Sequence, residues 1–264
     1  HWRVNLRTGG NHSWVVSLLP HLEQRALHER FDRRRHVSEN PSGPQAAQPA
    51  VLLCPSDKAE GRSYLYRPLS GGVEAQFGKG NYAAFASPFH IDDLDTPGAL
   101  SLYGQPLRRI TDGASRTAMF SEVRTRDHEL DQRGAWALPW SGATLLAVDA
   151  HPPWYPLRSS SRENAQDQFI VNTGWGGSLG HMQTPNSDEF DVLYDCPDLP
   201  GEQLERMPCT DTTGYISAAP RSNHPGGVAI AHVDGSCRFL PDDVDELVMA
   251  YLVSINDEQA PADP

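Results

Sequence analysis

Ser178 lies in the pattern Gly-x-Ser-x-Gly (residues 176–180), which in α/β-hydrolases presents a nucleophilic serine on a sharp turn between a strand and a helix. Asp211 and His224 follow it in the chain order that those enzymes use for the acid and the base. Turn-forming residues precede Ser178, however, and Pro185 interrupts any helix after it. We therefore expect no hydrolysis that depends on Ser178. A secreted serine hydrolase is kept as an alternative function.

Near the C-terminus, His224, His232 and Asp234 form a second candidate group, because imidazole and carboxylate groups bind zinc and other first-row metals. An architectural interpretation competes with this one. His224 would tie the loop that precedes a strand to the sheet, and Asp234 would stabilise the following turn through local backbone hydrogen bonds. We favour the architectural interpretation.

Aspartates are frequent between residues 188 and 211, in a stretch without regular periodicity. Calcium takes about six to eight oxygen ligands, which loop carboxylates and carbonyls supply. Asp195, Asp198 and Asp211 are therefore candidate calcium ligands, although their spacing does not follow the EF-hand pattern. The alternative is a set of solvated acidic side chains.

Tryptophans and prolines are concentrated between residues 136 and 175. Trp140, Trp154 and Trp175 are candidate ligand-binding residues of a glycan-binding module, because aromatic rings offer a large contact area at a small entropy cost. The alternative, which we favour, is that these rings fill the core of an irregular region.

The four cysteines are Cys54, Cys196, Cys209 and Cys237. Their spacing does not match that of a zinc knuckle, so it does not predict a zinc site. Cys196 and Cys209 flank a loop with few core residues, and we expect a disulfide there, worth about 3 kcal/mol in the chain-entropy model. Cys54 and Cys237 form a weaker candidate pair, and four unpaired thiols are the alternative.

Overall composition excludes some classes of partner. The formal net charge is −12, and no basic cluster of the kind that binds nucleic acid is present. No apolar run approaches the roughly 18 residues that span a bilayer.

Positioning of these side chains depends on a few recognisable elements. Apolar residues alternate over residues 228–233 and 236–240 around Asp234-Gly235, which predicts a hairpin with a two-residue type I′ turn. An apolar stripe over residues 243–255 predicts a C-terminal helix with Leu247 and Leu252 facing inward, started by Asp242 or Asp243. Ser13 is a candidate cap for a shorter helix that breaks at Pro20.

Together these elements predict an α+β fold with an antiparallel sheet, a C-terminal hairpin and a helix. We expect one domain over residues 1–264, with residues 141–221 as a large irregular insertion.

Several short blocks resemble a known family. They are residues 13–24, Leu53-Cys54-Pro55-Ser56-Asp57, Gly80-Asn81-Tyr82-Ala83-Ala84, residues 110–117 with Ser121-Glu122-Val123, and a His224 that nine residues separate from Asp234-Gly235. In this order they resemble a prepilin-like planctomycete family of unknown function. Members begin with a prepilin leader and a long hydrophobic helix, and this sequence begins at His1 with neither.

The resemblance implies a pseudopilin-like fold and export to the periplasm, cell surface or extracellular space, where disulfides persist. It also implies a non-enzymatic structural or surface role, with a homo-oligomer or pilus and secretion-system components as partners. Membrane attachment would come only through the N-terminal helix. Analogy with pseudopilins that hold calcium in a C-terminal loop supports the calcium hypothesis.

Overall fold

The computed structural model describes residues 9–68, 73–92, 96–101, 104–150, 182–197, 205–211 and 216–257. A five-stranded sheet with the order β5-β3-β4-β8-β9 forms its centre. The strands are β3 (Tyr82–Ser87), β4 (Ala118–Glu122), β5 (Leu145–Ala147), β8 (Gly227–His232) and β9 (Cys237–Pro241). Neighbours pair antiparallel except β3 and β5, which run parallel. The sheet is therefore mixed, with the predicted antiparallel hairpin at one edge.

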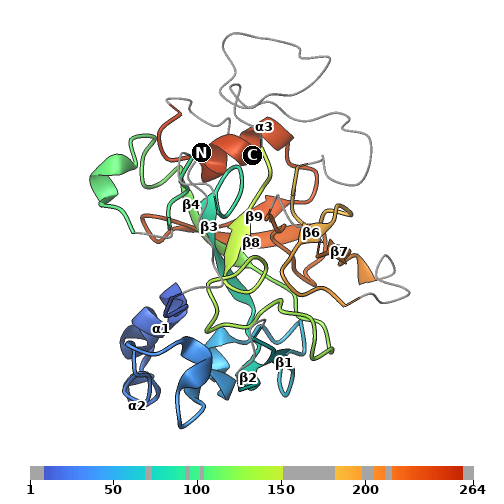
Figure 1. Ribbon diagram of the computed structural model, residues 1–264. Helices are drawn as coiled ribbons and strands as arrows, with labels where there is room; N and C mark the ends of the chain where they lie inside the picture. Colours follow the sequence, from blue (N-terminus) through green and yellow to red (C-terminus); the bar gives the residue numbers. More distant parts are fainter. Residues whose placement is uncertain are drawn as a thin grey trace.

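Smaller elements surround this sheet (Figure 1). Strands β1 (Ser63–Tyr66) and β2 (Ala75–Gly78) form an antiparallel pair, and β6 (Asp191–Val192) and β7 (Cys209–Thr210) form a short parallel pair. The α-helices are α1 (Trp14–Leu18), α2 (Arg25–His28) and α3 (Glu246–Val253). The 3-10 helices are η1 (Leu19–Leu22), η2 (Val37–Glu39), η3 (Pro44–Ala46), η4 (Ala50–Leu52) and η5 (Leu107–Arg109). Figure 1 shows α1, α2, β1 and β2 at one end of the molecule and α3 at the other.

The predicted break at Pro20 is confirmed, because α1 ends at Leu18 and Pro20 lies in the first turn of η1. Ser13 occupies the cap position, but its side chain does not cap the helix. Its hydroxyl instead donates to the carbonyl of Trp136 at 2.6 Å. The Ser13 side chain thus connects the start of α1 to a distant part of the chain and does not cap the helix.

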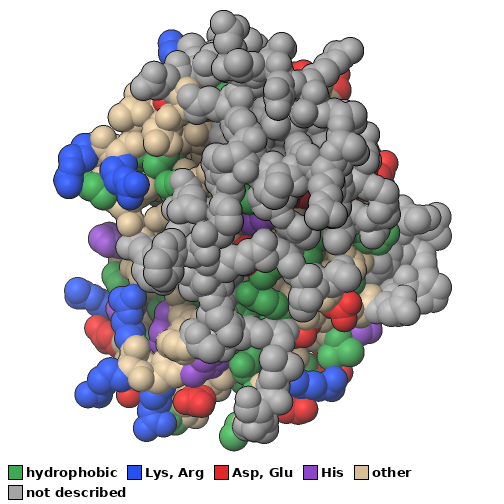
Figure 2. Space-filling model, turned by 45° about the horizontal axis from the view of Figure 1, so that its top comes forward, with side chains coloured by type: hydrophobic (Ala, Val, Ile, Leu, Met, Phe, Trp, Pro, Cys, Tyr) green, Lys and Arg blue, Asp and Glu red, His purple; other side chains and the backbone are tan. Residues whose placement is uncertain are grey.

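Charged side chains are distributed over the surface in view in Figure 2. Lys and Arg side chains lie around the rim of this face, several of them beside Asp or Glu side chains. Within the described ranges, no helix combines the length and the apolar character that crossing a bilayer requires.

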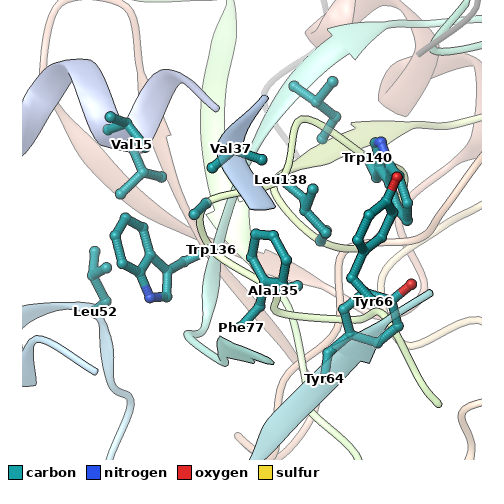
Figure 3. Packing of buried hydrophobic residues seen from close by; sticks show 14 of the residues in the cluster. Val15, Val37, Leu52, Tyr64, Tyr66, Phe77, Ala135, Trp136, Leu138 and Trp140 are labelled. Carbon is teal, nitrogen blue, oxygen red and sulfur yellow. The ribbon is translucent and has the colours of Figure 1, made fainter. Parts of the chain in front are cut away.

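Two groups of buried apolar residues form the core. The first packs α1, α2, β1 and β2 around Trp136 and Trp140, and the second packs α3 against the central sheet. Figure 3 shows Trp136 between Val15 and Leu52, with Trp140 beside the rings of Tyr64 and Tyr66. Burial of one large apolar side chain stabilises a fold by roughly 1.5–3 kcal/mol, so these rings account for much of the packing energy at this end.

The hairpin turn differs from the predicted two-residue type I′ turn. His232 N–H donates to the Ser236 carbonyl at 2.8 Å and Gly235 N–H to the His232 carbonyl at 2.9 Å, so residues 233–235 connect the strands. Gly235 has a φ of 85°, whereas Asp234 has no positive φ. This is the geometry of a three-residue loop that ends in a glycine bulge. The Asp234 carboxylate accepts from Ser236 N–H at 2.9 Å, which confirms its expected role in the turn.

The C-terminal helix is shorter than predicted, and its cap is a different residue. Asp245, and not Asp242 or Asp243, accepts hydrogen bonds from the N–H groups of residues 247 and 248. Leu252 is buried as predicted, but Leu247 is only partly buried. The buried helical residues are Met249, Ala250, Leu252 and Val253. The inward face is therefore rotated from the predicted stripe.

Residues 141–221 contribute β5 to the central sheet as well as β6 and β7. The run from Leu145 to Val148 is buried throughout. A strand covered on both faces shows no alternation of apolar and polar residues, and sequence periodicity therefore does not reveal it.

The disulfide between Cys196 and Cys209 is present, as predicted. The weaker prediction, a second disulfide between Cys54 and Cys237, is wrong, because both are free cysteines. Cys54 is buried, whereas Cys237 is exposed at the start of the edge strand β9. The expectation that both cysteines occupy buried strand positions therefore fails for Cys237.

We predict that Gly235→Val lowers the free energy of unfolding by about 1 kcal/mol or more, because a β-branched residue is poorly suited to a positive φ. A Cβ at this position meets no atom within 4 Å, so the loss reports backbone conformation and not a clash. Urea denaturation measures it. Gly235→Asn is the matched control and should lose less, since asparagine tolerates this conformation. Equal stability of the valine variant and the original chain would contradict the prediction.

Candidate functional site

Asp57 is the centre of a buried polar junction. Its Oδ2 accepts hydrogen bonds from Asn81 Nδ2 at 2.7 Å and from the N–H and hydroxyl of Thr125 at 2.8 and 2.7 Å. Its Oδ1 accepts from Asn223 Nδ2 at 3.0 Å, and the side-chain carbonyl of Asn81 accepts from Cys54 N–H at 2.8 Å. One carboxylate therefore holds together segments from four distant parts of the chain.

Beside this junction, Cys54, Glu122 and His224 place three potential ligand atoms within 4.8 Å of one another. His224 Nε2 lies 3.1 Å from Glu122 Oε1 and 3.7 Å from Cys54 Sγ. Cys54 and Glu122 are buried, whereas the His224 side chain is 38% exposed. The three residues come from the turn after η4, the end of β4 and the loop before β8.

The geometry of this cluster is not that of a Cys-His-acid catalytic triad. A triad uses one ring nitrogen of histidine toward the nucleophile and the other toward the acid. Here the same nitrogen, Nε2, faces both Glu122 and Cys54. A single nitrogen offers one proton or one lone pair, so it does not serve two partners as a proton relay. A thiol, an imidazole and a carboxylate around one point are instead suited to a cation.

Each of the three residues is also held through its backbone or its second oxygen. Glu122 Oε2 accepts from Ala229 N–H at 2.7 Å, which leaves Oε1 directed at His224. His224 N–H donates to Ser222 Oγ at 3.0 Å, and Arg221 N–H donates to the Glu122 carbonyl at 2.9 Å. The loop that carries His224 is therefore attached directly to the strand that carries Glu122.

Tyr82, at the start of β3, reports on the electrostatics of this region. Burial raises the pKa of Tyr82, and the negative charges available at Cys54 and Glu122 raise it further. The phenol thus stays neutral over the physiological range.

A buried group of charges supports the loop from the other side. Arg133 contacts Asp131 at 2.5 Å and Asp191 at 3.0 Å, and Arg221 contacts Asp191 at 3.0 Å. All four side chains are at most 2% exposed. Burial alone would raise the pKa of Asp131, but the charge and hydrogen bonds of Arg133 reverse this effect and lower it to about 2. The Asp131 and Asp191 carboxylates in turn raise the pKa of Arg133 despite its burial.

A protein-family model described as "Protein of unknown function (DUF1559)" matches residues 2–247. The chain belongs to the DUF1559 family. No curated protein and no solved structure matched the chain. The sequence blocks also resembled a family of unknown function, and the match agrees with that. The function is therefore inferred from the chemistry of the DUF1559 chain itself.

Two of the three candidate calcium ligands of the DUF1559 chain, Asp195 and Asp211, fall in the described residues. Asp195 is partly buried and accepts a hydrogen bond from the Tyr64 hydroxyl, and Asp211 is exposed. Asp198 lies outside the described residues. Among the described residues, neither Asp195 nor Asp211 belongs to a group of three close ligand atoms. Calcium binding by these residues stays a prediction.

Of the candidate ligand-binding tryptophans, only Trp140 falls in the described ranges, and Trp154 and Trp175 lie outside them. Trp140 is fully buried, with its ring centroid 5.7 Å from that of Tyr66 and 5.2 Å from that of Tyr194 (Figure 3). Its ring has no free face for a sugar, because core residues cover it.

The remaining sequence candidates separate from one another. Ser178 also lies outside the described residues. His232 is buried in β8 and Asp234 lies in the exposed turn, so neither joins His224 as a ligand. His224 does contact the strand β4 through Glu122, as expected if it ties its loop to the sheet.

Cys54 and Glu122 do not appear among the ligands predicted from the sequence. Both stand in the blocks that carry the family resemblance, residues 53–57 and 121–123. Each block thus contributes a side chain of a type that can ligate metals, as does the His224 motif. The presence of such a residue in each block could have suggested a shared site. Spacing within one segment does not reveal the site, because the blocks lie far apart in the sequence.

We predict that Asp131→Asn lowers the free energy of unfolding by about 3 kcal/mol or more at neutral pH, because it leaves a buried guanidinium partly unpaired. The folded pKa of Asp131 is below its ordinary value of 3.8, so its contribution is present above that pH and is lost as the pH falls toward about 2. The difference in stability between the variant and the original chain should therefore shrink by about 2 kcal/mol over that window. Denaturation at several pH values measures this difference.

Asp243→Asn, at an exposed position, is the control and should change stability little at any pH. A stability difference for Asp131→Asn that stays constant down to about pH 2 would contradict the assigned pKa.

Proposed function

We propose that this DUF1559 protein is an exported, non-enzymatic structural or surface protein with a pseudopilin-like architecture. The observation that carries the proposal is that polar residues of the sequence blocks form buried hydrogen bonds between distant segments. Asp57 and Asn81 are occupied by hydrogen bonds that join Cys54, Thr125 and Asn223. Side chains that hold distant segments together in this way serve the architecture.

The disulfide supports the export part of the proposal. Cys196 and Cys209 are bonded across a loop whose described part has little regular structure. Disulfides of this kind form and persist in oxidising compartments and are rare in the cytosol of most organisms. The acidic net charge of −12 adds solubility outside the cell and disfavours a nucleic-acid partner.

Assembly is the remaining part of the proposal. A pseudopilin-like protein would join copies of itself or secretion-system components through an N-terminal hydrophobic helix. The folded body would then be displayed outside the membrane, held rigid by the junction at Asp57. Light scattering of the full-length gene product, with and without that helix, tests whether assembly depends on it.

The exposed thiol of Cys237 allows a direct test of export. A membrane-impermeant maleimide added to spheroplasts should label the protein at Cys237, because Cys54 is buried and the other two cysteines are bonded. Cys237→Ser is the matched control and should abolish the labelling. Labelling that appears only after lysis would overturn the exported location.

We predict that Asp57→Asn lowers the free energy of unfolding by about 2 kcal/mol or more, because an amide nitrogen would face hydrogen-bond donors in a buried junction. Replacing a catalytic residue commonly leaves stability unchanged or raises it, since active sites trade stability for activity. Thermal or urea denaturation therefore separates the two roles. Asp188→Asn, in an ion pair whose aspartate is 79% exposed, should cost little. An Asp57→Asn variant as stable as the original chain would argue against the architectural role.

A further inference from the structure

The arrangement of Cys54, Glu122 and His224 goes beyond what a structural role requires. Their ligand atoms surround one point, and the same ring nitrogen faces both the thiol and the carboxylate. A hydrogen bond from His224 to Glu122 would satisfy one of these two contacts. The Cys54 sulfur would then lie 3.7 Å from a ring nitrogen whose single proton or lone pair is already used by Glu122.

Two of the three separations between ligand atoms are close to those around a tetrahedral zinc ion. Zinc bonds of about 2.3 Å to sulfur and about 2.0–2.2 Å to nitrogen and oxygen place sulfur and nitrogen about 3.6 Å apart, and nitrogen and oxygen about 3.4 Å apart. The corresponding distances here are 3.7 Å and 3.1 Å. The sulfur and the carboxylate oxygen lie within 4.8 Å of each other, so the three ligand atoms would close on an ion between them. His224 is the most exposed of the three side chains.

The donor set also selects the metal. Calcium and magnesium take oxygen ligands, whereas a thiolate with an imidazole and a carboxylate suits zinc. A thiolate and a carboxylate bring two negative charges that a divalent ion neutralises. Neutrality matters because Cys54 and Glu122 are buried, where unpaired charges are costly.

The surroundings hold each ligand as they do in metal sites, where partners around the ligands fix their orientation. Ala229 N–H holds the second oxygen of Glu122, the Asn81 side chain holds the backbone of Cys54, and Ser222 Oγ holds that of His224. We propose that Cys54, Glu122 and His224 bind one zinc ion, with a solvent molecule in the fourth position on the exposed side of His224. The ion would clasp the loop before β8 to β4 and to the turn after η4.

The test uses the purified chain with its disulfide intact, first stripped of metal by a chelator. Titration with Co²⁺, a spectroscopic substitute for Zn²⁺, should give a thiolate-to-cobalt charge-transfer band and the strong visible bands of a four-coordinate ion, saturating at one ion per chain. Zn²⁺ should displace the cobalt and raise the melting temperature, since it binds the folded state. A chain that takes up no cobalt, or more than one ion with no charge-transfer band, overturns the proposal.

Variants identify the ligands. Cys54→Ser should remove the charge-transfer band, whereas Cys237→Ser, which changes the other free cysteine, should keep it. His224→Gln should weaken zinc binding by more than about a hundredfold, since even partners around the ligands contribute about 10- to 100-fold. His21→Gln, at an exposed histidine, should have no effect.

Circular dichroism checks that each variant is folded. Should Cys54→Ser fail to fold, His224→Gln provides the deciding result, because its side chain is the most exposed of the three. A charge-transfer band that survives Cys54→Ser, or unchanged zinc affinity in folded His224→Gln, overturns the assignment. Neither result depends on whether the protein is exported.

Discussion

Asp191 accepts two buried guanidinium groups at once, and much of the irregular half of the molecule depends on this interaction. Arg133 approaches it from the segment before β5, and Arg221 approaches it from the segment that leads to β8. Asp131 balances the second positive charge. Desolvation of four charges is expensive unless every hydrogen bond is made. The remaining donors of the two arginines accordingly reach the backbone carbonyls of residues 187, 189, 206 and 207. Loops without regular backbone pairing are thereby fixed by side chains.

This charge group also determines where His224 lies. Arg221 is anchored through its side chain to Asp191 and through its backbone N–H to the carbonyl of Glu122. His224 follows three residues later, and its N–H is held by Ser222. The contact between His224 and Glu122 is therefore the end of a continuous series of buried interactions. These interactions position a side chain on a loop as accurately as a sheet positions a side chain on a strand.

Local patterns predicted the parts of the fold that local interactions determine. The hairpin, the C-terminal helix, the break at Pro20 and the disulfide at Cys196 all rest on spacing within one short segment. The strand β5 and its parallel pairing with β3 escaped prediction, because a run buried on both faces has no period and its partner is remote. Asp131 and Arg133 were not core candidates, since charged residues are rarely fully buried unless paired. Likewise, 170 residues separate Cys54 from His224 in sequence, a distance over which spacing carries no information.

The architectural role of His224 and a role as a metal ligand are compatible, because they use different parts of the residue. Its backbone N–H is occupied by Ser222, and only the ring reaches Glu122 and Cys54. The other two ligands are fixed in buried surroundings, so an ion would draw the ring and its loop inward and leave the sheet unchanged. Gly226, with a φ of 83° and open space where a Cβ would lie, connects this loop to β8. The site is thus buried on the side of the sheet and open on the side of the His224 ring that faces solvent.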